Sequence, residues 1–321
     1  MENIPYIDTS KSDTFKKQTG QIIKDIDWVK YISAPEDNKF HLYSSNIWTL
    51  EANFTRAGLT KEEGYNILTE LFKRITVFTN KDLVSQLQKA CKYFNEMVKG
   101  SFIGVIEYGS SDYQKGIVKS KDWMMHEAMK YIKPQFLQNY EKINSNGTYV
   151  IIDDAVYSGD QLSFELLSLL ENTSSSIIYL LIMFSTEFGI NRLEKNINFD
   201  SKEDHGECFI YHIGKHVLHL WKGYIIIESV PSILKEINPE NPKANQFIYK
   251  TILTEGATVT IFEHKLADYK SLVWIVKNIF YILMEEHYIN TPPYQIVASF
   301  VSKKKNNLKF VNQDINYLKR V

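Results

Sequence analysis

The stretch from Tyr149 to Ser163 restricts the possible folds more than any other part of the chain. It opens with four residues of high strand propensity, Tyr149 to Ile152, and continues into two acidic residues, Asp153 and Asp154. A small polar turn follows, and the next residues place leucines at helical spacing. A continuously apolar strand is typical of the centre of a parallel sheet that is covered on both faces. The stretch therefore predicts an α/β fold with a mostly parallel central sheet.

The turn after the acid pair is suited to binding an anion. Residues 158–161 would open the next helix, and the first N–H groups of a helix have no partner within it. Ligands of parallel sheets bind at the carboxyl ends of the strands, where the acids and the turn would lie. Carboxylates beside such N–H groups fit a ligand with hydroxyl groups, a phosphate and a divalent cation. A buried strand that ends in a helix cap is the alternative explanation, and it needs no ligand.

The residues Asp153 to Gly159, Asp-Asp-Ala-Val-Tyr-Ser-Gly, resemble the binding signature of type I phosphoribosyltransferases. The Tyr-Ser-Gly variant is similar to phosphoribosyltransferase-like proteins of large DNA viruses and prokaryotes. The resemblance implies a phosphoribosyltransferase-type sheet, phosphoribosyl pyrophosphate or a related ribose phosphate as ligand, and Mg²⁺ as cofactor. It implies that Asp153 and Asp154 contact the ribose and, through the ligand, the metal. The residues implied around the 5′-phosphate are Tyr157, Ser158, Gly159, Asp160 and Gln161.

The chain departs from the family pattern in two ways. Asp160 stands where the family usually has Gly or Lys, and Gln161 replaces the usual Thr. In addition, only about forty residues separate the upstream turn at Ser111 from Asp153, so a mobile cover over the site has little room. Such a cover excludes water while an oxocarbenium-like ribose forms. Hydrolysis, a cover from elsewhere in the chain, and binding without turnover therefore stay open beside base transfer.

The segment upstream of the acid pair predicts a second strand and turn. Phe102 to Tyr108 reads as a strand, and Gly109, Ser110 and Ser111 follow it. By position this turn matches the pyrophosphate-binding loop of the family, although Gly-Ser-Ser is also typical of an ordinary surface loop. A helix is predicted from Asp122 to Tyr140.

Downstream of the acid pair, the pattern predicts one more strand before a mixed segment. Ile177 to Phe184 is fully apolar and reads as a strand parallel to the one that carries the acids. Residues 185–206 read as a short helix around Ile190 to Leu193, followed by a charged loop.

A further strand end lies near His264. Ala257 to Phe262 predicts a strand, and His264, Lys265 and Asp268 follow it. This repeats the arrangement at the acid pair, so these side chains are candidates for the same crevice. His264 or Lys265 would then act as a general acid or base, and Asp268 would contact the ligand. A helix cap with solvated charges is the alternative.

The segment from Cys208 to Trp221 raises the question of a zinc site. Its potential ligands are Cys208, His212, His216 and His219. Alternating residues and the Gly214-Lys215 turn fit a β-hairpin better than a shared metal site. The histidines are alternatively candidates for lining an acceptor pocket.

By pattern the chain divides into three parts. Residues 1–98 are predicted to be mostly helical, and the sequence from Thr60 to Glu63 has the form of a capping box. Residues 99–300 form the predicted α/β core, and residues 301–321 form a basic tail.

The composition of the chain limits the classes of partner that we expect it to bind. The net charge of −1 provides no general basic field for nucleic acid or an anionic membrane, although the basic tail leaves a nucleic-acid contact open. The apolar run from Leu272 to Met284 is shorter than the ~20 residues of a membrane span. Cys91 and Cys208 provide no disulfide framework, and the N-terminus lacks a signal-peptide pattern. We therefore expect a cytoplasmic protein with a small-molecule ligand, and a homodimer stays possible.

Overall fold

The computed structural model describes residues 7–25, 52, 54–98, 103–105, 120–133, 146–246 and 257–264, and every structural statement below concerns these residues. The chain forms two compact units. The first unit comprises residues 1–8 and 81–227, and the second comprises residues 9–80 and 228–321. The units follow boundaries different from the three predicted parts, because the chain leaves the second unit at residue 80 and returns to it at residue 228.

The first unit is built on a seven-stranded sheet in the order β2-β3-β4-β7-β6-β5, with β8 beside β4. The strands β2, β3, β4, β7 and β8 pair in parallel, and β6 is antiparallel to both of its neighbours. The sheet is therefore mostly parallel, which confirms the predicted fold class. The strands are β2 (Ile103–Val105), β3 (Asn146–Val156), β4 (Ser175–Ser185), β5 (Ser201–Asp204), β6 (Cys208–Ile213), β7 (His216–Trp221) and β8 (Ile225–Ile226).

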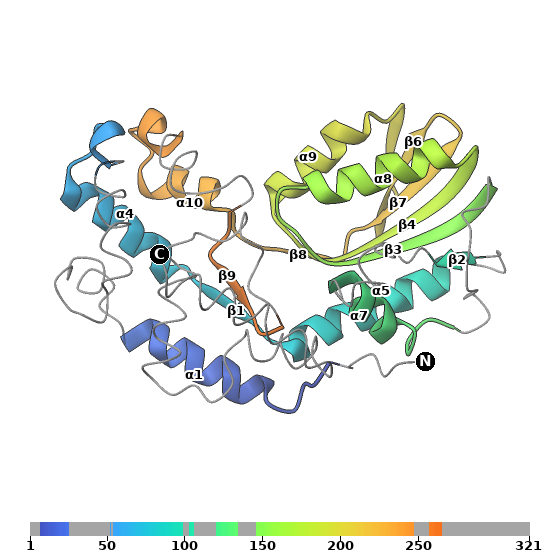
Figure 1. Ribbon diagram of the computed structural model, residues 1–321, viewed down its shortest axis with the longest axis horizontal. Helices are drawn as coiled ribbons and strands as arrows, with labels where there is room; N and C mark the ends of the chain where they lie inside the picture. The colour runs from blue at the N-terminus through green and yellow to red at the C-terminus, as the bar shows by residue number, and fades with distance from the viewer. Residues whose placement is uncertain are drawn as a thin grey trace, which may run out of the picture. The chain divides into compact units, whose positions relative to one another are not determined.

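Helices cover both faces of this sheet (Figure 1). On one face lie α8 (Asp160–Asn172) and α9 (Glu187–Ile197), and on the other lie α5 (Asn80–Met97) and α7 (Ser120–Ala128). The buried leucines of α8 recur at helical spacing and pack with alternate residues of β3 and β4 in one hydrophobic cluster. On the opposite face, the ring of Phe94 in α5 lies edge-on against Tyr179 in β4, at 5.3 Å between centroids. Coverage on both sides explains why β3 and β4 are continuously apolar.

The strand β3 is longer than predicted. It runs through Asp153 and Asp154 and ends at Val156, rather than ending before the acid pair. Pairing with β4 continues past the acids, with Ala155 opposite Phe184 and Val156 opposite Ser185. Backbone hydrogen bonding to a long buried neighbour thus outweighs the low strand propensity of aspartate.

Two further predictions need correction. The helix expected from Asp122 to Tyr140 begins at Ser120 and ends at Ala128, after which residues 129–132 form turns. The charged loop expected after Leu193 is instead the end of a longer α9 followed by the strand β5. All four residues of β5 are exposed, and the strand exists because it pairs with β6. A polar edge strand has no hydrophobic alternation, so the sequence does not show it.

Other elements of the first unit agree with the sequence pattern. The strand predicted from Ile177 to Phe184 is β4, and it pairs with β3 in parallel through a connection that contains α8. The segment from Cys208 to Trp221 forms the predicted hairpin of β6 and β7. Gly214 adopts a positive φ of 56° in its turn.

The second unit is mainly helical. It contains α1 (Ser12–Asp25), α4 (Lys61–Lys73) and α10 (Val230–Ile237), together with a two-stranded parallel sheet of β1 (Thr76–Phe78) and β9 (Thr260–Phe262). The predicted capping box is present, because the Thr60 N–H donates to Glu63 Oε2 at 2.7 Å and the Glu63 N–H donates to Thr60 Oγ1 at 3.2 Å. The strand predicted from Ala257 to Phe262 pairs with β1, a strand that the sequence pattern did not predict, and not with the central sheet.

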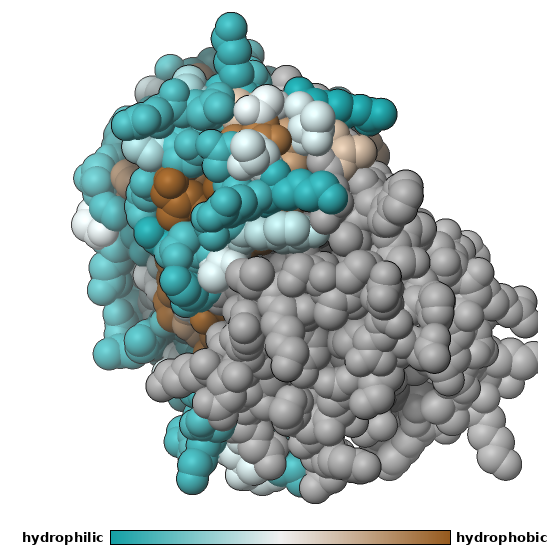
Figure 2. Space-filling model, turned by 90° about the vertical axis from the view of Figure 1, so that its left-hand side faces the viewer, coloured by the Kyte–Doolittle hydropathy of each residue, from teal (hydrophilic) through white to brown (hydrophobic). Residues whose placement is uncertain are grey.

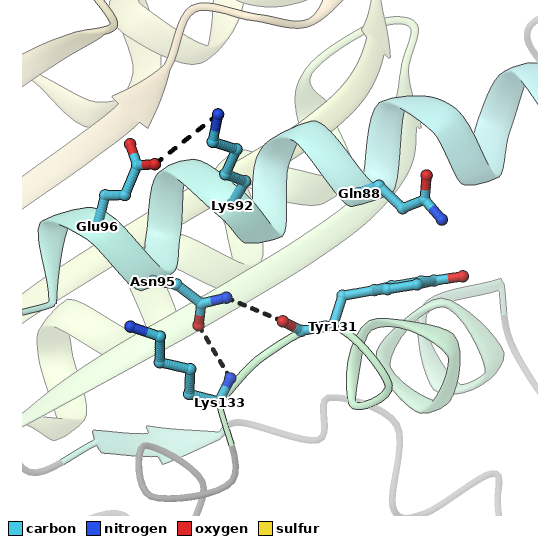
Figure 3. A pocket seen from close by; sticks show the side chains of 6 residues that line it. All are labelled: Gln88, Lys92, Asn95, Glu96, Tyr131 and Lys133. Atoms are coloured by element: carbon cyan, nitrogen blue, oxygen red, sulfur yellow. Dashed lines mark hydrogen bonds and ion pairs between the residues drawn. The ribbon is translucent and has the colours of Figure 1, made fainter.

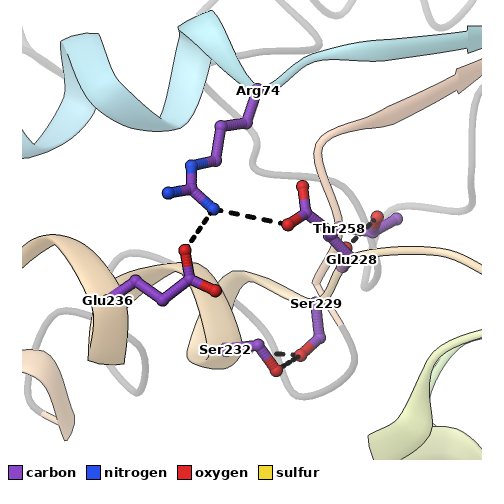
Figure 4. Close-up of polar contacts among 6 residues, drawn as sticks. All are labelled: Arg74, Glu228, Ser229, Ser232, Glu236 and Thr258. Atoms are coloured by element: carbon purple, nitrogen blue, oxygen red, sulfur yellow. Dashed lines mark hydrogen bonds and ion pairs between the residues drawn. The ribbon is translucent and has the colours of Figure 1, made fainter.

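Polar contacts of Arg74 tie this unit together (Figure 4). Its Nη1 lies 2.6 Å from Glu236 in α10 and 3.4 Å from Glu228. The Thr258 hydroxyl donates to the Glu228 carbonyl at 2.7 Å, and the Ser229 side chain caps α10. The segment before α10 is therefore held both to the residue that follows α4 and to the segment before β9.

The described surface has an ordinary polar character. Figure 2 shows mostly hydrophilic side chains on the coloured part of one face, with smaller hydrophobic areas between them. None of the described helices is both long enough and apolar enough to cross a membrane. The segment from Leu272 to Met284 and the basic tail lie outside the described residues.

Candidate functional site

The acid pair lies close to the carboxyl end of β3, within the strand. Asp153 is 8% exposed and Asp154 is fully buried, and the Asp154 N–H donates to Asp153 Oδ1 at 3.0 Å. Successive side chains of a strand point to opposite faces of the sheet. We therefore expect the two carboxylates to differ in their access to a ligand, a difference that the sequence motif alone does not reveal.

The turn between β3 and α8 depends on a glycine. Gly159 precedes the first residue of α8 and adopts a left-handed conformation with φ of 77°. No side chain caps this helix. The Asp160 N–H makes one long contact, 3.4 Å, to Ser158 Oγ. An α-helix that starts without a side-chain cap offers its first N–H groups to water or to an anion.

Close packing of two glycines brings the first turns of α8 and α9 together. A methyl group on Gly159 would lie 2.4 Å from the Gly189 carbonyl oxygen. A methyl group on Gly189 would lie 2.8 Å from the Tyr157 carbonyl oxygen and 2.9 Å from that of Val156. Real side-chain atoms do not approach this closely, so both positions require glycine.

Thr186 fixes the turn to the end of β4. Its hydroxyl donates to the Tyr157 carbonyl at 2.6 Å and accepts a hydrogen bond from the Gly189 N–H at 2.8 Å. Its own N–H donates to the Val156 carbonyl at 3.0 Å. One residue therefore caps α9 and holds the loop that follows the acid pair.

Asp160 forms an ion pair that the sequence pattern did not predict. Its Oδ1 lies 2.7 Å from Nε of Arg192, which belongs to α9. The side chains are 50% and 33% exposed, respectively. Gln161, the other departure from the family pattern, donates from Nε2 to Glu165 at 3.2 Å. Arg192 follows Gly189 by three residues, but only the packing of α8 on α9 shows that this spacing matters.

The remaining predicted site residues lie in the second unit or outside the described residues. His264 is buried and follows β9 in the second unit, with its ring 5.2 Å from that of Phe262. Lys265 and Asp268 lie outside the described residues, and so does the turn of Gly109, Ser110 and Ser111. The strand before that turn, β2, pairs with β3 and ends at Val105 opposite Val150.

The three histidines of the hairpin have separate partners. The hydroxyl of Ser176 lies 2.8 Å from His216 Nδ1, and the ring of His219 stacks on Tyr179 at 4.7 Å. His212 Nε2 lies 3.5 Å from Glu203. Burial is the main cause that lowers the pKa of His219 and favours its neutral form. Within the described ranges, no group of three or more His, Cys, Asp or Glu side chains could hold a metal ion.

A surface pocket of about 300 Å³ lies elsewhere on the first unit, between α5 and the turn that follows α7 (Figure 3). Asn95 joins its two walls, since its side chain donates to the Tyr131 carbonyl and accepts from the Lys133 N–H, both at 2.9 Å. None of the predicted site residues that the structure describes lines it. The lining residues are Gln88, Lys92, Asn95, Glu96, Tyr131 and Lys133.

Comparison with known proteins identifies the family. No curated protein and no solved structure matches the chain. The family model named PRTase-CE matches residues 53–273, which is more than half of the chain and includes the acid pair and the glycine turn. The chain therefore belongs to the PRTase-CE family and is a phosphoribosyltransferase-like protein.

Proposed function

We propose that this protein binds phosphoribosyl pyrophosphate, or a related ribose phosphate, together with Mg²⁺, and transfers the phosphoribosyl group to an acceptor. One arrangement carries the proposal: a buried acid pair on a central parallel strand, followed directly by a glycine turn that opens an uncapped helix. This arrangement occurs in a chain of a phosphoribosyltransferase-like family. Ligands of such sheets bind at the carboxyl ends of the strands.

The negatively charged carboxylates and the N–H groups of the turn would bind different parts of the ligand. Asp153 and Asp154 would accept hydrogen bonds from ribose hydroxyls, and their negative charge would stabilise the positive charge that develops on the ribose ring. The turn from Tyr157 to Gln161 would hold the 5′-phosphate with backbone N–H groups. During transfer, the bond between the anomeric carbon and pyrophosphate breaks, and the acceptor forms a bond to the same carbon.

Magnesium fits this site as an ion that arrives with the ligand. The acid pair supplies the carboxylate oxygens that Mg²⁺ prefers, and Mg²⁺ commonly combines one or two carboxylates with phosphate oxygens and water. Among the described residues, no group of three or more His, Cys, Asp or Glu side chains could hold a metal ion without the ligand. When bound, the ion would neutralise charge on the pyrophosphate.

The other predicted residues have proposed roles around this centre. Gly109, Ser110 and Ser111 would bind the departing pyrophosphate through backbone N–H groups. His264 or Lys265 would act as the acid or base for the acceptor, and Asp268 would contact the ligand.

A second candidate function is sensing of the same ligand without turnover. Its support is the position of the acids inside β3, where Asp154 is fully buried and Asp153 nearly so. A binding protein needs the phosphate turn and one accessible carboxylate, whereas transfer also requires stabilisation of the ribose cation. Release of pyrophosphate separates the two candidates.

Ligand-induced stabilisation tests whether the site exists. A ligand that binds only the native state raises the apparent melting temperature. Millimolar phosphoribosyl pyrophosphate with Mg²⁺ should therefore raise the melting temperature of the wild-type protein, and Asp154→Asn should abolish the shift. Asp153→Asn provides a second test if removal of the buried charge prevents folding. Asp200→Asn is the control, because this exposed carboxylate lies in the same unit and accepts from the Gly214 N–H.

The outcomes distinguish the candidates. A ligand-dependent shift with release of pyrophosphate on addition of a nucleobase supports the enzyme, and a shift without release supports the sensor. No shift at millimolar ligand would leave a structural or interaction role for the motif. A shift that survives both substitutions in the acid pair would contradict the assignment of the site.

A further inference from the structure

Arg192 lies beside the turn proposed to bind phosphate, but the proposed function assigns it no role. It lies on α9, three residues after Gly189, whose carbonyl packs against Gly159. The backbone nitrogen of Leu193, the next residue, would lie 3.1 Å from a methyl group at position 159. The main chain around Arg192 therefore borders the glycine turn directly.

Two contacts orient the guanidinium. Nε lies 2.7 Å from the carboxylate of Asp160, the first residue of α8. The guanidinium carbon also lies 5.8 Å from the ring centre of Phe188, within the range of a cation–π contact. A third of the Arg192 side chain and half of the Asp160 side chain remain exposed, so a ligand from solvent can reach both.

Charge explains why such a pair would matter at this turn. A carboxylate in the first turn of α8 would repel a phosphate that approaches the same N–H groups. An arginine beside it compensates that charge. Because guanidinium presents five N–H donors in a planar fork, it can bind a phosphate as readily as a carboxylate.

We infer that Arg192 is a phosphate-binding residue of this site and determines its preference for phosphorylated ribose. In the ligand-free protein Arg192 pairs with Asp160, and a bound 5′-phosphate takes over the contact. This inference rests on the proposed function, since it assumes that a ribose phosphate occupies the turn. It assigns to α9 a ligand-binding residue that the motif on β3 and α8 does not contain.

Calorimetric titration with ribose 5-phosphate and with ribose, both in the presence of Mg²⁺, tests the inference. Removal of a charge-assisted hydrogen bond in Arg192→Gln should weaken binding of ribose 5-phosphate by about 10- to 100-fold and leave ribose unaffected. Arg192→Lys should give an intermediate affinity, because a lysine retains the charge but not the fork. Asp160→Asn should strengthen binding of ribose 5-phosphate by about threefold or more, because it removes a competitor and a repelling charge.

Arg74→Gln is the matched control. Arg74 is 31% exposed and pairs with carboxylates, as Arg192 does, but it belongs to the second unit. Its substitution should leave both affinities unchanged. Arg192→Gln and Asp160→Asn disrupt the same ion pair, so a general loss of folded protein would weaken binding in both variants. The opposite changes in affinity expected here cannot arise in that way.

Failure of the inference is distinguishable from failure of the proposed function. If wild-type protein binds neither ribose 5-phosphate nor phosphoribosyl pyrophosphate, the proposed function is wrong. If wild type binds them and Asp154→Asn does not, but Arg192→Gln retains affinity within twofold, the site stands and the role of Arg192 is overturned. Weaker binding of ribose 5-phosphate by Asp160→Asn would overturn that role as well.

Discussion

Gly159 meets two independent restrictions, one in its backbone and one in its packing. Its φ of 77° lies in the left-handed region, which costs other L-residues about 1–2 kcal/mol. The carbonyl of Gly189 in addition fills the space in which a side chain would begin. The sequence motif shows that a glycine stands at this position, but its contact across to α9 is visible only in the folded chain.

The substitution Gly159→Ala should destabilise the protein by about 2–4 kcal/mol, from backbone strain and steric conflict together. Gly206→Ala is the matched control, because Gly206 has φ of 69° and no atom lies within 4 Å of its added methyl group. It should cost only about 1 kcal/mol. Urea unfolding measures both losses. Equal losses would mean that the contact with Gly189 is unimportant.

The pH dependence of folding stability tests whether the Cys91 thiol is buried. Burial raises the pKa of its thiol to about 12, whereas a thiol in the unfolded chain titrates near 8.5–9. Between these values the unfolded state loses a proton that the folded state keeps, so stability falls as pH rises. The contribution is at most about 1.4 kcal/mol per pH unit.

Cys91→Ala should therefore reduce the loss of stability between pH 9 and 11, measured by urea unfolding at several pH values. Tyrosines whose pKa values are also raised by burial, such as Tyr179, contribute to the alkaline loss in both proteins. Only the difference between the two proteins in the slope of unfolding free energy against pH reports on Cys91. Identical slopes would show that the thiol titrates normally in the folded protein.

Among the elements, the junction of β4 and α9 holds the loop that follows the acid pair. Thr186 caps α9 and donates to the carbonyl of Tyr157, so a residue 29 positions downstream fixes the loop after the acid pair. Ser185 assists, since its hydroxyl donates to the Val156 carbonyl at 3.2 Å. The shape of the site thus depends on the parallel pairing of β3 with β4.

Thr186→Ala should destabilise the protein by about 2 kcal/mol, because it removes both a helix cap and a buried hydrogen bond. Thr186→Ser retains the hydroxyl and should stay close to wild type. Thermal unfolding of the three proteins provides the measurement. If the serine variant were as unstable as the alanine variant, packing of the threonine methyl group would be the important contact instead.

The sequence predicts long apolar elements better than short or polar ones. The strand at Tyr149 and the strand at Ile177 were predictable, because burial on both faces makes them continuously apolar. The exposed residues of β5 and the three residues of β1 have no such pattern, and each strand forms only because another segment pairs with it, β6 just downstream for β5 and the distant β9 for β1. The same reason explains why Arg192 could not be predicted: its partner lies on another helix.

At the scale of the whole molecule, the chain passes from the second unit into the first and back again. The family match at residues 53–273 includes parts of both units, so the similarity is not confined to the sheet. A boundary of this kind cannot be located from local sequence, because residues of the second unit that are far apart in the chain form β1 and β9. His264 belongs to that second unit, and its proposed part in catalysis remains a prediction.

The most direct test of the proposed site locates the ligand on the folded chain. Hydrogen–deuterium exchange of the intact protein should be measured with and without phosphoribosyl pyrophosphate and Mg²⁺, using mass spectrometry of peptides. Bound ligand should slow exchange in the peptide from Asp154 to Ser163, because the N–H groups at the start of α8 would donate to the phosphate. Asp154→Asn should show no such protection. Unchanged exchange in this peptide at saturating ligand, or protection confined to other segments, would contradict a ribose-phosphate site at the end of β3.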